Sequence, residues 1–228
     1  NVKSGICSIA TSSIDTITVD APSVGGSISS SGSVCYGNNS GILTLTGNTG
    51  SVVRWEYSVD NGITYNQVAS TTPTYNFINI TTTTLYRVVV KNNSCATANS
   101  SVATLTVSPV SVGGTISGST TVCSGSNTGV LTLSGKTGAV QRWESSTNAG
   151  ATWTNIANTT TSQSYTNVLS TTYYRALVKS GSCSNDTSSI AIITVDAVSN
   201  GGTLAGTDTV CKGSNNGTLT LSGQTGTV

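Results

Sequence analysis

The chain has 228 residues, of which 36% are hydrophobic and only 7% are charged, and its formal net charge is +1. Globular proteins usually carry about 25% charged residues. This sequence has neither the basic stripe that nucleic-acid binding requires nor the high net charge of a disordered chain. It also has no apolar run near the ~20 residues of a membrane helix. We therefore expect no nucleic-acid partner and no membrane insertion in this segment.

Short alternating segments separated by turns follow one another along residues 20–107. In chain order the predicted strands are a broken first strand at Ser27–Ser29 and Gly32–Tyr36, then Ile42–Thr46, Val52–Ser58, Thr64–Val68, Thr74–Ile78, Leu85–Lys91 and Val102–Val107. Apolar residues alternate with Thr and Ser in these segments, which is the period of a half-buried strand. Asn61-Gly62 predicts a hairpin turn, because this pair readily supplies the positive φ angles of a type I′ turn.

The same pattern returns every 88 residues without a gap. The shift superimposes two series of cysteines, namely Cys7, Cys95 and Cys183, and Cys35, Cys123 and Cys211. It also carries Arg54-Trp55-Glu56 onto Arg142-Trp143-Glu144. A fixed period of this length indicates an array of folded units. We divide the chain into the C-terminal part of a preceding repeat (1–19), a first repeat (20–107), a second repeat (108–195) and the N-terminal part of a following repeat (196–228).

The fold class that follows is all-β, with tandem immunoglobulin-like β-sandwich domains. About seven short strands in ~88 residues, with turn signals every 8–12 residues, are typical of such a sandwich. Short linkers join the repeats, and they begin at Asp20, Ser108 and Asp196. Because short linkers limit bending, we expect the domains to stack end to end as a rod, each adding roughly 35–45 Å at ~3.3 Å per strand residue.

The cysteines predict disulfides, because they recur at fixed positions without CxxC metal pairs or any histidine. Disulfides in turn indicate an oxidising, extracytoplasmic compartment. The favoured pairing lies within each repeat, Cys35 with Cys95 and Cys123 with Cys183, and it leaves Cys7 and Cys211 with partners outside this sequence. The alternative pairs each cysteine with the nearest cysteine of the adjacent repeat, as in Cys95 with Cys123, and would connect neighbouring repeats.

One hairpin carries a recognisable motif in both repeats. The residues Ser58-x-Asp60-x-Gly62-x-Thr64-Tyr65 return as Ser146-x-Asn148-x-Gly150-x-Thr152-Trp153. The motif resembles the Asp-box hairpin of sialidases, in which the acid side chain bonds local backbone. Asn replaces Asp in the second repeat, so we interpret the motif as structural. Tyr65 and Trp153 at its end are the candidate sugar-stacking residues.

The strand around Trp55 should divide its side chains between two environments. On a strand, Trp55 faces opposite to Arg54 and Glu56, so we expect Trp55 and Trp143 in the core and the charged residues outside. Glu56 should pair with Arg87 or Lys91 on the neighbouring strand. We expect this pair to be exposed and to contribute only ~0–1 kcal/mol, with a ligand site as the alternative interpretation.

No catalytic residue, cofactor-binding residue or metal ligand is predicted. Without histidine there is no Ser-His-Asp or Cys-His arrangement, and the sequence has neither a phosphate-binding glycine loop nor a calcium loop. Glu56 is the one carboxylate that both repeats keep in a potential site, and it stands alone. We therefore expect no enzyme activity in this segment.

The repeat resembles the immunoglobulin-like repeats of giant cell-surface adhesins of Flavobacterium and other Bacteroidetes, the SprB-like gliding adhesins. The residues that carry the resemblance are Val34-Cys35-x-Gly37, Leu43–Gly47, Arg54-Trp55-Glu56-x-Ser58, Thr84-x-Tyr86-Arg87 with Val90-Lys91, and Cys95. The resemblance implies export by type IX secretion, an extracellular location at the cell surface, and a role in attachment to polysaccharide or solid surfaces and in gliding motility.

The function expected from the sequence is that of a stalk or filament segment in such an adhesin, in contact with neighbouring repeats of the same chain. The first alternative is a tandem array of carbohydrate-binding modules, in which Tyr65 and Trp153 stack on sugars. A second alternative is a non-catalytic appendage of a secreted enzyme.

Overall fold

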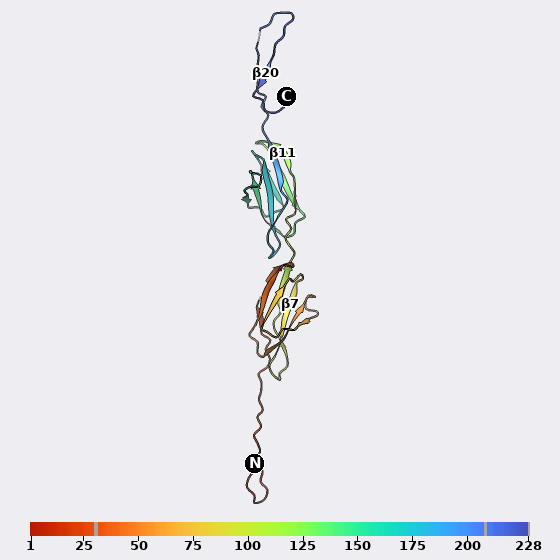
Figure 1. Ribbon diagram of the computed structural model, residues 1–228, viewed down its shortest axis with the longest axis vertical. Helices are drawn as coiled ribbons and strands as arrows, with labels where there is room; N and C mark the ends of the chain where they lie inside the picture. The colour runs from red at the N-terminus through yellow and green to blue at the C-terminus, as the bar shows by residue number, and fades with distance from the viewer. Residues whose placement is uncertain (30–31, 208, 228) are drawn as a thin grey trace. The chain divides into compact units, whose positions relative to one another are not determined.

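The computed structural model describes residues 1–29, 32–207 and 209–227, and within them every regular element is a β-strand (Figure 1). The chain divides into two compact units, residues 1–107 and 108–228. Each unit contains one complete sandwich. The fold class predicted from the sequence, tandem immunoglobulin-like β-sandwiches, is confirmed.

Nine strands lie in the described part of the first repeat. They are β1 (Ser27–Ser29), β2 (Gly32–Cys35), β3 (Ser40–Thr46), β4 (Ser51–Ser58), β5 (Asn66–Val68), β6 (Thr74–Ile78), β7 (Thr84–Lys91), β8 (Ala98–Asn99) and β9 (Ala103–Ser108). One sheet has the order β1-β3-β6, and the other has the order β2-β9-β7-β4-β5 with β8 paired to β7. The broken first strand of the sequence analysis is thus two strands, and they belong to opposite sheets.

The second repeat reproduces this arrangement with every strand bound shifted by 88 residues. Its strands are β10 (Thr115–Ser117), β11 (Thr120–Cys123), β12 (Thr128–Ser134), β13 (Ala139–Ser146), β14 (Thr154–Ile156), β15 (Ser162–Thr166), β16 (Thr172–Lys179), β17 (Asp186–Thr187) and β18 (Ala191–Asp196). Its sheets have the orders β10-β12-β15 and β11-β18-β16-β13-β14, with β17 paired to β16. The 88-residue period of the sequence is therefore also the period of the structure.

Each core forms where the inner faces of the two sheets meet. In the first repeat Trp55 of β4 is fully buried, as is Leu43 of β3 in the opposite sheet. Trp143 and Leu131 occupy the same places in the second repeat. The indole Nε1 of Trp55 donates a hydrogen bond to the carbonyl oxygen of Thr72 at 2.9 Å, so burial leaves no unpaired donor on the ring. The prediction that these tryptophans anchor the cores is confirmed.

A close backbone approach explains the repeated Gly-Gly pair at the start of each repeat. A Cβ atom on Gly25 would lie 1.9 Å from the carbonyl oxygen of Asn99, and one on Gly113 would lie 2.1 Å from that of Thr187. No side chain fits at such a distance. Glycine is required here because β8 or β17 passes directly over the incoming chain.

The chain on either side of the two sandwiches is more open. Residues 1–19 include an isolated bridge between Val2 and Ala10, and their side chains are exposed. After the second repeat, β19 (Thr203–Ala205) pairs with β20 (Thr220–Ser222) in the register that β10 and β12 use 88 residues earlier. The assignment of both segments to incomplete repeats stays a prediction.

Candidate functional site

A charged cluster on the outer face of the larger sheet is the most organised polar site in each repeat. Glu56 lies opposite Arg87 in the register of β4 and β7. Its Oε2 accepts a hydrogen bond from Arg87 Nε at 2.7 Å, and its Oε1 accepts one from Arg54 Nε at 2.7 Å. In the second repeat Glu144 is held in the same way, by Arg175 Nε at 2.7 Å and Arg142 Nε at 2.8 Å. Of the two partners foreseen for Glu56, the structure selects Arg87.

The expectation that this pair is solvent-exposed is wrong. Glu56 is only 4% exposed and Glu144 only 3%, although both lie on the face away from the core. Burial by itself would raise the pKa of the Glu56 carboxyl. The hydrogen bonds and positive charges of Arg87 and Arg54 outweigh burial, so the pKa lies below its usual value, and Glu144 shows the same balance with Arg175 and Arg142. Each glutamate therefore stays ionised beneath its arginines.

An aromatic ring completes each cluster. The Arg87 guanidinium carbon lies 3.6 Å from the centre of the Tyr65 ring, and that of Arg175 lies 4.1 Å from the Trp153 ring. These are cation–π contacts. Neither ring belongs to the hydrophobic core of its repeat, and both are partly exposed. The two candidate sugar-stacking residues thus lie at equivalent outer positions, with one ring face directed at an arginine.

The hairpin before each aromatic ring is held by its own side chains. In the first repeat Ser58 Oγ donates to Asp60 Oδ1 at 2.7 Å and accepts from the Gly62 amide at 2.8 Å, while the Thr64 amide donates to Asp60 Oδ1 at 3.0 Å. The hydrogen bonds from Thr64 and Ser58 lower the pKa of Asp60 to about 2. The hydrogen bonds that the Asp60 carboxylate accepts therefore come from within the hairpin, as the structural interpretation of the motif requires.

The second repeat keeps this geometry with an amide in place of the acid. Ser146 Oγ donates to Asn148 Oδ1 at 2.8 Å, and the Thr152 amide donates to the same oxygen at 2.9 Å. Asn148 Nδ2 donates to Thr152 Oγ1 at 2.8 Å. The turn itself has φ of 59° at Asn61 and 87° at Gly62, as the sequence predicted, but the second repeat places Ala149 at φ 56°. A negative charge is therefore not needed for the hairpin.

The cysteines do not pair as the sequence analysis favoured. Cys35 and Cys183 are disulfide-bonded, whereas Cys95 and Cys123, their expected partners within each repeat, are free thiols, as are Cys7 and Cys211. The alternative pairing, with the nearest cysteine of the adjacent repeat, would leave no free thiol in the chain, so it does not fit either.

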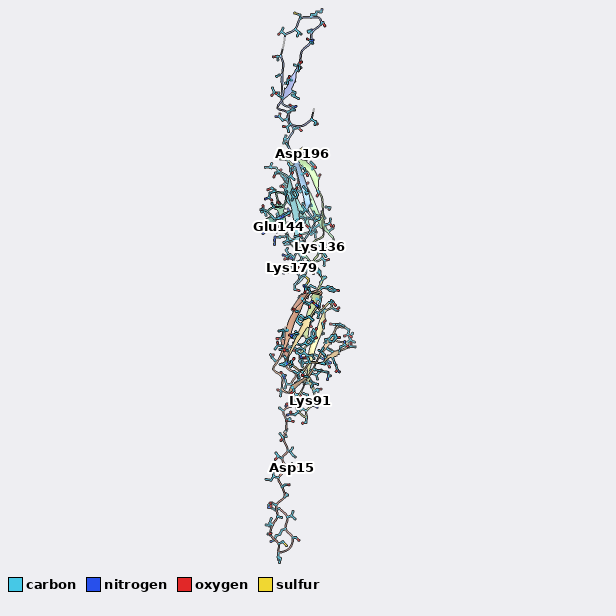
Figure 2. All side chains as sticks on the ribbon, in the orientation of Figure 1. Asp15, Lys91, Lys136, Glu144, Lys179 and Asp196 are labelled. Atoms are coloured by element: carbon cyan, nitrogen blue, oxygen red, sulfur yellow. The ribbon has the colours of Figure 1, made fainter. Side chains whose placement is uncertain are left out.

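Distance within the sandwich explains why Cys123 cannot reach Cys183. Cys123 lies beside Asp196 in the pairing of β11 with β18, and Cys183 follows the far end of β16, after Lys179. Asp196 and Lys179 lie at opposite ends of this sandwich (Figure 2). The eight residues of β16 span roughly 23 Å at ~3.3 Å per residue, whereas a disulfide requires Cα atoms about 4.4–6.8 Å apart.

The described residues contain no cluster of three or more cysteine or carboxylate side chains that could hold a metal ion. Within the same part of the chain, no helix has the length and apolar character needed to cross a membrane.

Sequence reasoning missed the burial of Glu56, because the covering groups come from a strand and a hairpin that only the folded chain brings together.

Two facing sheets with short strands, repeated in tandem, define a protein built of immunoglobulin-like and fibronectin type III-like β-sandwich modules. The chain belongs to the family described as "Domain of unknown function (DUF8696)", whose model matches residues 24–109 and 112–197. No curated protein matches the chain.

Solved structures share the fold at low sequence identity. The chain is similar to one in the crystal structure of the mouse coronavirus receptor-binding domain complexed with its murine receptor, with a TM-score of 0.51, 11% identity, and coverage of 72% of this chain and 96% of the other. It is also similar to titin domains A168–A170 (TM-score 0.47, 12% identity, coverage 78% and 68%) and to Clostridium thermocellum CbhA fibronectin(III)-like modules (TM-score 0.35, 13% identity, coverage 75% and 94%). At these identities the likeness concerns the fold alone.

Proposed function

We propose that this chain is a non-catalytic stalk segment of a secreted bacterial cell-surface adhesin. In this role the tandem sandwiches carry load between the cell and whatever the whole adhesin contacts, such as a polysaccharide or a solid surface. The resemblance to SprB-like repeats adds export by type IX secretion and a contribution to gliding motility. Neighbouring repeats of the same chain would be the immediate partners of each module.

The observation that carries this proposal is the pairing of the terminal strands. In the second repeat β11, near the start, runs parallel to β18 at the end, with Thr120 opposite Ile193 and Cys123 opposite Asp196. Tension along the chain pulls β11 toward its N-terminus and β18 toward its C-terminus, which are opposite directions along one strand pair. The hydrogen bonds between the strands are therefore loaded together in shear. In the first repeat β2 and β9 are also neighbours in the larger sheet.

The difference between the two repeats supports the same conclusion. Both keep the buried tryptophan and the glutamate held by two arginines. Asp60 becomes Asn148 and Tyr65 becomes Trp153 at the positions where a binding or catalytic role would demand a fixed residue type. The repeats thus preserve the interactions that hold the sandwich together, which is the requirement of a load-bearing module.

The test is to image the intact protein on its cell and to identify the full-length chain by mass spectrometry. We expect long surface filaments that carry many 88-residue repeats, and we expect them to disappear when the gene is deleted. A short secreted enzyme that carries only a few of these domains would contradict the stalk proposal and support the appendage alternative.

A carbohydrate-binding array is the second candidate, and one observation favours it. Tyr65 and Trp153 recur at the same outer position, partly exposed and backed by an arginine. Binding to a panel of bacterial and plant polysaccharides would test it, with Trp153→Ala against the exposed-residue control Leu169→Ala. Binding that only Trp153→Ala weakens supports this function, and equal behaviour of both variants with every glycan contradicts it.

A further inference from the structure

A small cavity opens at one end of the first sandwich. Its volume is about 200 Å³, and its walls come from the end of β4, the start of β7 and the segment 79–82 between β6 and β7. Pockets for drug-sized ligands usually measure about 300–1,000 Å³, whereas one water molecule occupies about 30 Å³. The cavity therefore has room for a single small ring and not for a long chain.

Two tyrosines from adjacent strands line this cavity. Tyr57 of β4 lies directly opposite Tyr86 of β7 in the register of the larger sheet, so both side chains lie on the same face. That face is the inner one, since Tyr86 belongs to the hydrophobic core and Tyr57 packs against it. Tyr86 is only 4% exposed, whereas Tyr57 is partly exposed. Tyr57 therefore offers ring surface to a ligand, while Tyr86 is held in the core.

The Tyr86 hydroxyl is the polar end of a buried side chain, and the chain leaves it unpaired. Within the described residues, no protein group forms a hydrogen bond with it. Every fully buried side-chain nitrogen or oxygen atom in that part of the chain has a partner, so the Tyr86 oxygen reaches the cavity surface. Burial raises the pKa of Tyr86 to about 12, and Tyr75 and Tyr57 add to the effect. The hydroxyl thus keeps its proton and can both donate and accept a hydrogen bond.

The walls of the cavity are fixed by packing and by hydrogen bonds. The ring centre of Tyr86 lies 5.6 Å from that of Tyr75, which lies 5.6 Å from that of Trp55. The Asn39 carboxamide holds the main chain of Ile80, since Nδ2 donates to the Ile80 carbonyl oxygen at 2.7 Å and Oδ1 accepts from its amide at 3.0 Å. Groups that are already ordered lose little entropy when a ligand binds. The cavity is therefore preorganised.

The lining combines apolar surface with neutral hydroxyl groups. Val59 and Ile80 add aliphatic surface to the Tyr57 ring, and Thr82 and Thr84 add hydroxyls. No residue that lines the cavity is charged at neutral pH. A charged ligand would lose hydration here without gaining a counter-charge. A neutral sugar ring, by contrast, presents apolar C–H faces and neutral hydroxyl groups, which are the two kinds of surface that the cavity offers.

We propose that this cavity binds one neutral sugar ring, either as a free monosaccharide or as a terminal unit of a polysaccharide. The ring packs against Tyr57, and one of its hydroxyl groups forms a hydrogen bond with Tyr86. The site is separate from Tyr65, whose ring contacts Arg87 on the outer face of the sheet. It also does not depend on the stalk function, because a stalk module could have it or lack it.

The second repeat lacks the aromatic wall of this site. Ser145 stands at the position of Tyr57, although Tyr174 keeps the place of Tyr86. Without the Tyr57 ring, the sugar has no aromatic surface on which to pack. We therefore expect binding in the first repeat only, and the second repeat serves as an internal control.

Amide chemical shifts of the 228-residue chain, followed by NMR during titration with sugars, test the proposal. The probes are glucose, galactose, mannose and N-acetylglucosamine, with dextran, galactan and mannan as the polysaccharide sources. We expect at least one probe to shift the amides of residues 79–86 saturably, with a Kd of about 1 mM for so small a ligand. A response to polysaccharides alone identifies the polysaccharide as the source. The absence of a saturable shift in residues 79–86 with every probe would overturn the proposal, as would a stronger response to glucuronate than to glucose.

Two variants and a matched control locate the binding. Tyr86→Phe should weaken it about 3–10-fold, the usual effect of one neutral hydrogen bond, and should leave thermal stability unchanged because no hydrogen bond within the protein is lost. Tyr57→Ser, which copies the second repeat, should weaken binding at least about tenfold. The control Tyr174→Phe should bind like the wild type. Wild-type affinity in both Tyr86→Phe and Tyr57→Ser would contradict the site. Shifts centred on Tyr65 and Trp153 would also contradict it and would support the carbohydrate-binding array instead.

Discussion

Arg87 on β7 donates from Nε to Oε2 of Glu56 on β4 at 2.7 Å, although the two residues are 31 positions apart in the sequence. The same guanidinium lies over the ring of Tyr65. One arginine therefore neutralises a buried carboxylate, connects two central strands and orders the hairpin that follows β4. Arg175 has the same three roles in the second repeat.

Removing Arg87 should strongly destabilise the first repeat. In Arg87→Met the buried Glu56 keeps only Arg54, and loss of one partner of a buried pair costs about 3–5 kcal/mol. Because the Arg87 side chain is 28% exposed and Arg54 remains, we expect about 2–3 kcal/mol, somewhat below that range. Hydrogen exchange of the β4 and β7 amides would measure it. Lys91→Met, an exposed change on the same strand, is the control and should alter stability by less than about 0.5 kcal/mol. Equal effects of the two variants would contradict the role given to Arg87.

Acid should loosen the hairpin of the first repeat more than that of the second. The folded-state pKa of Asp60 is lowered from 3.8 to about 2. Its stabilising contribution is therefore complete above pH 3.8 and is lost as the pH falls through about 2. Asn148 does not titrate, so exchange protection of the Thr64 amide should fall relative to that of Thr152 between pH 5 and pH 2. Asp60→Asn should abolish the difference, and a difference that persists in this variant would have another origin.

The turn at Ala149 offers a gain in stability. Its φ of 56° is in the left-handed region, which costs a residue with a Cβ atom roughly 1–2 kcal/mol. Ala149→Gly should therefore stabilise the second repeat by about 1 kcal/mol. Asn61 occupies the equivalent position in the first repeat, at φ 59°. Asn61→Ala should destabilise the first repeat by a comparable amount, since Asn tolerates the left-handed region better than Ala does. Thermal unfolding followed by repeat-specific exchange would measure both changes, and shifts of the same sign would refute the explanation.

A methyl group at Gly25 should prevent the close passage of β8. The added Cβ would meet the Asn99 carbonyl oxygen at 1.9 Å, and backbone cannot swing aside as a side chain can. We expect Gly25→Ala to cost at least about 3 kcal/mol, the upper end of the usual overpacking range. Gly32→Ala is the matched control, because its Cβ would meet nothing within 4 Å. Chemical denaturation of both variants would decide, and similar midpoints would argue against the close approach.

The sequence predicted the strands well because their apolar residues alternate over the whole length of each strand. Thr74–Ile78 agrees with β6 at both ends, and the predicted Val52–Ser58 differs from β4 by one residue. β8 has only two residues and no alternation to detect. The structural role of the hairpin was predicted correctly because the hydrogen bonds of Ser58 and Asp60 are local in sequence.

The features that could not be predicted depend on which segments, distant in sequence, the folded chain brings together. The burial of Glu56 requires Arg87 from another strand. In the sequence, this glutamate and arginine look like any exposed ion pair. The predicted Cys123–Cys183 bridge fails because the two cysteines emerge at opposite ends of the second sandwich. The spacing of cysteines along the chain does not tell at which end of a sandwich each one lies. The equal spacing of the two cysteines in each repeat therefore favoured a pairing within the repeat.

Every strand bound in the second repeat equals its counterpart in the first plus 88. Each repeat also encloses its own tryptophan and its own glutamate–arginine cluster. Unequal crossing-over between two copies of the coding sequence would therefore add or delete a whole module in frame and leave the remaining cores complete. Such a gene can change the length of its product in single generations, and the new product needs no compensating substitution to fold.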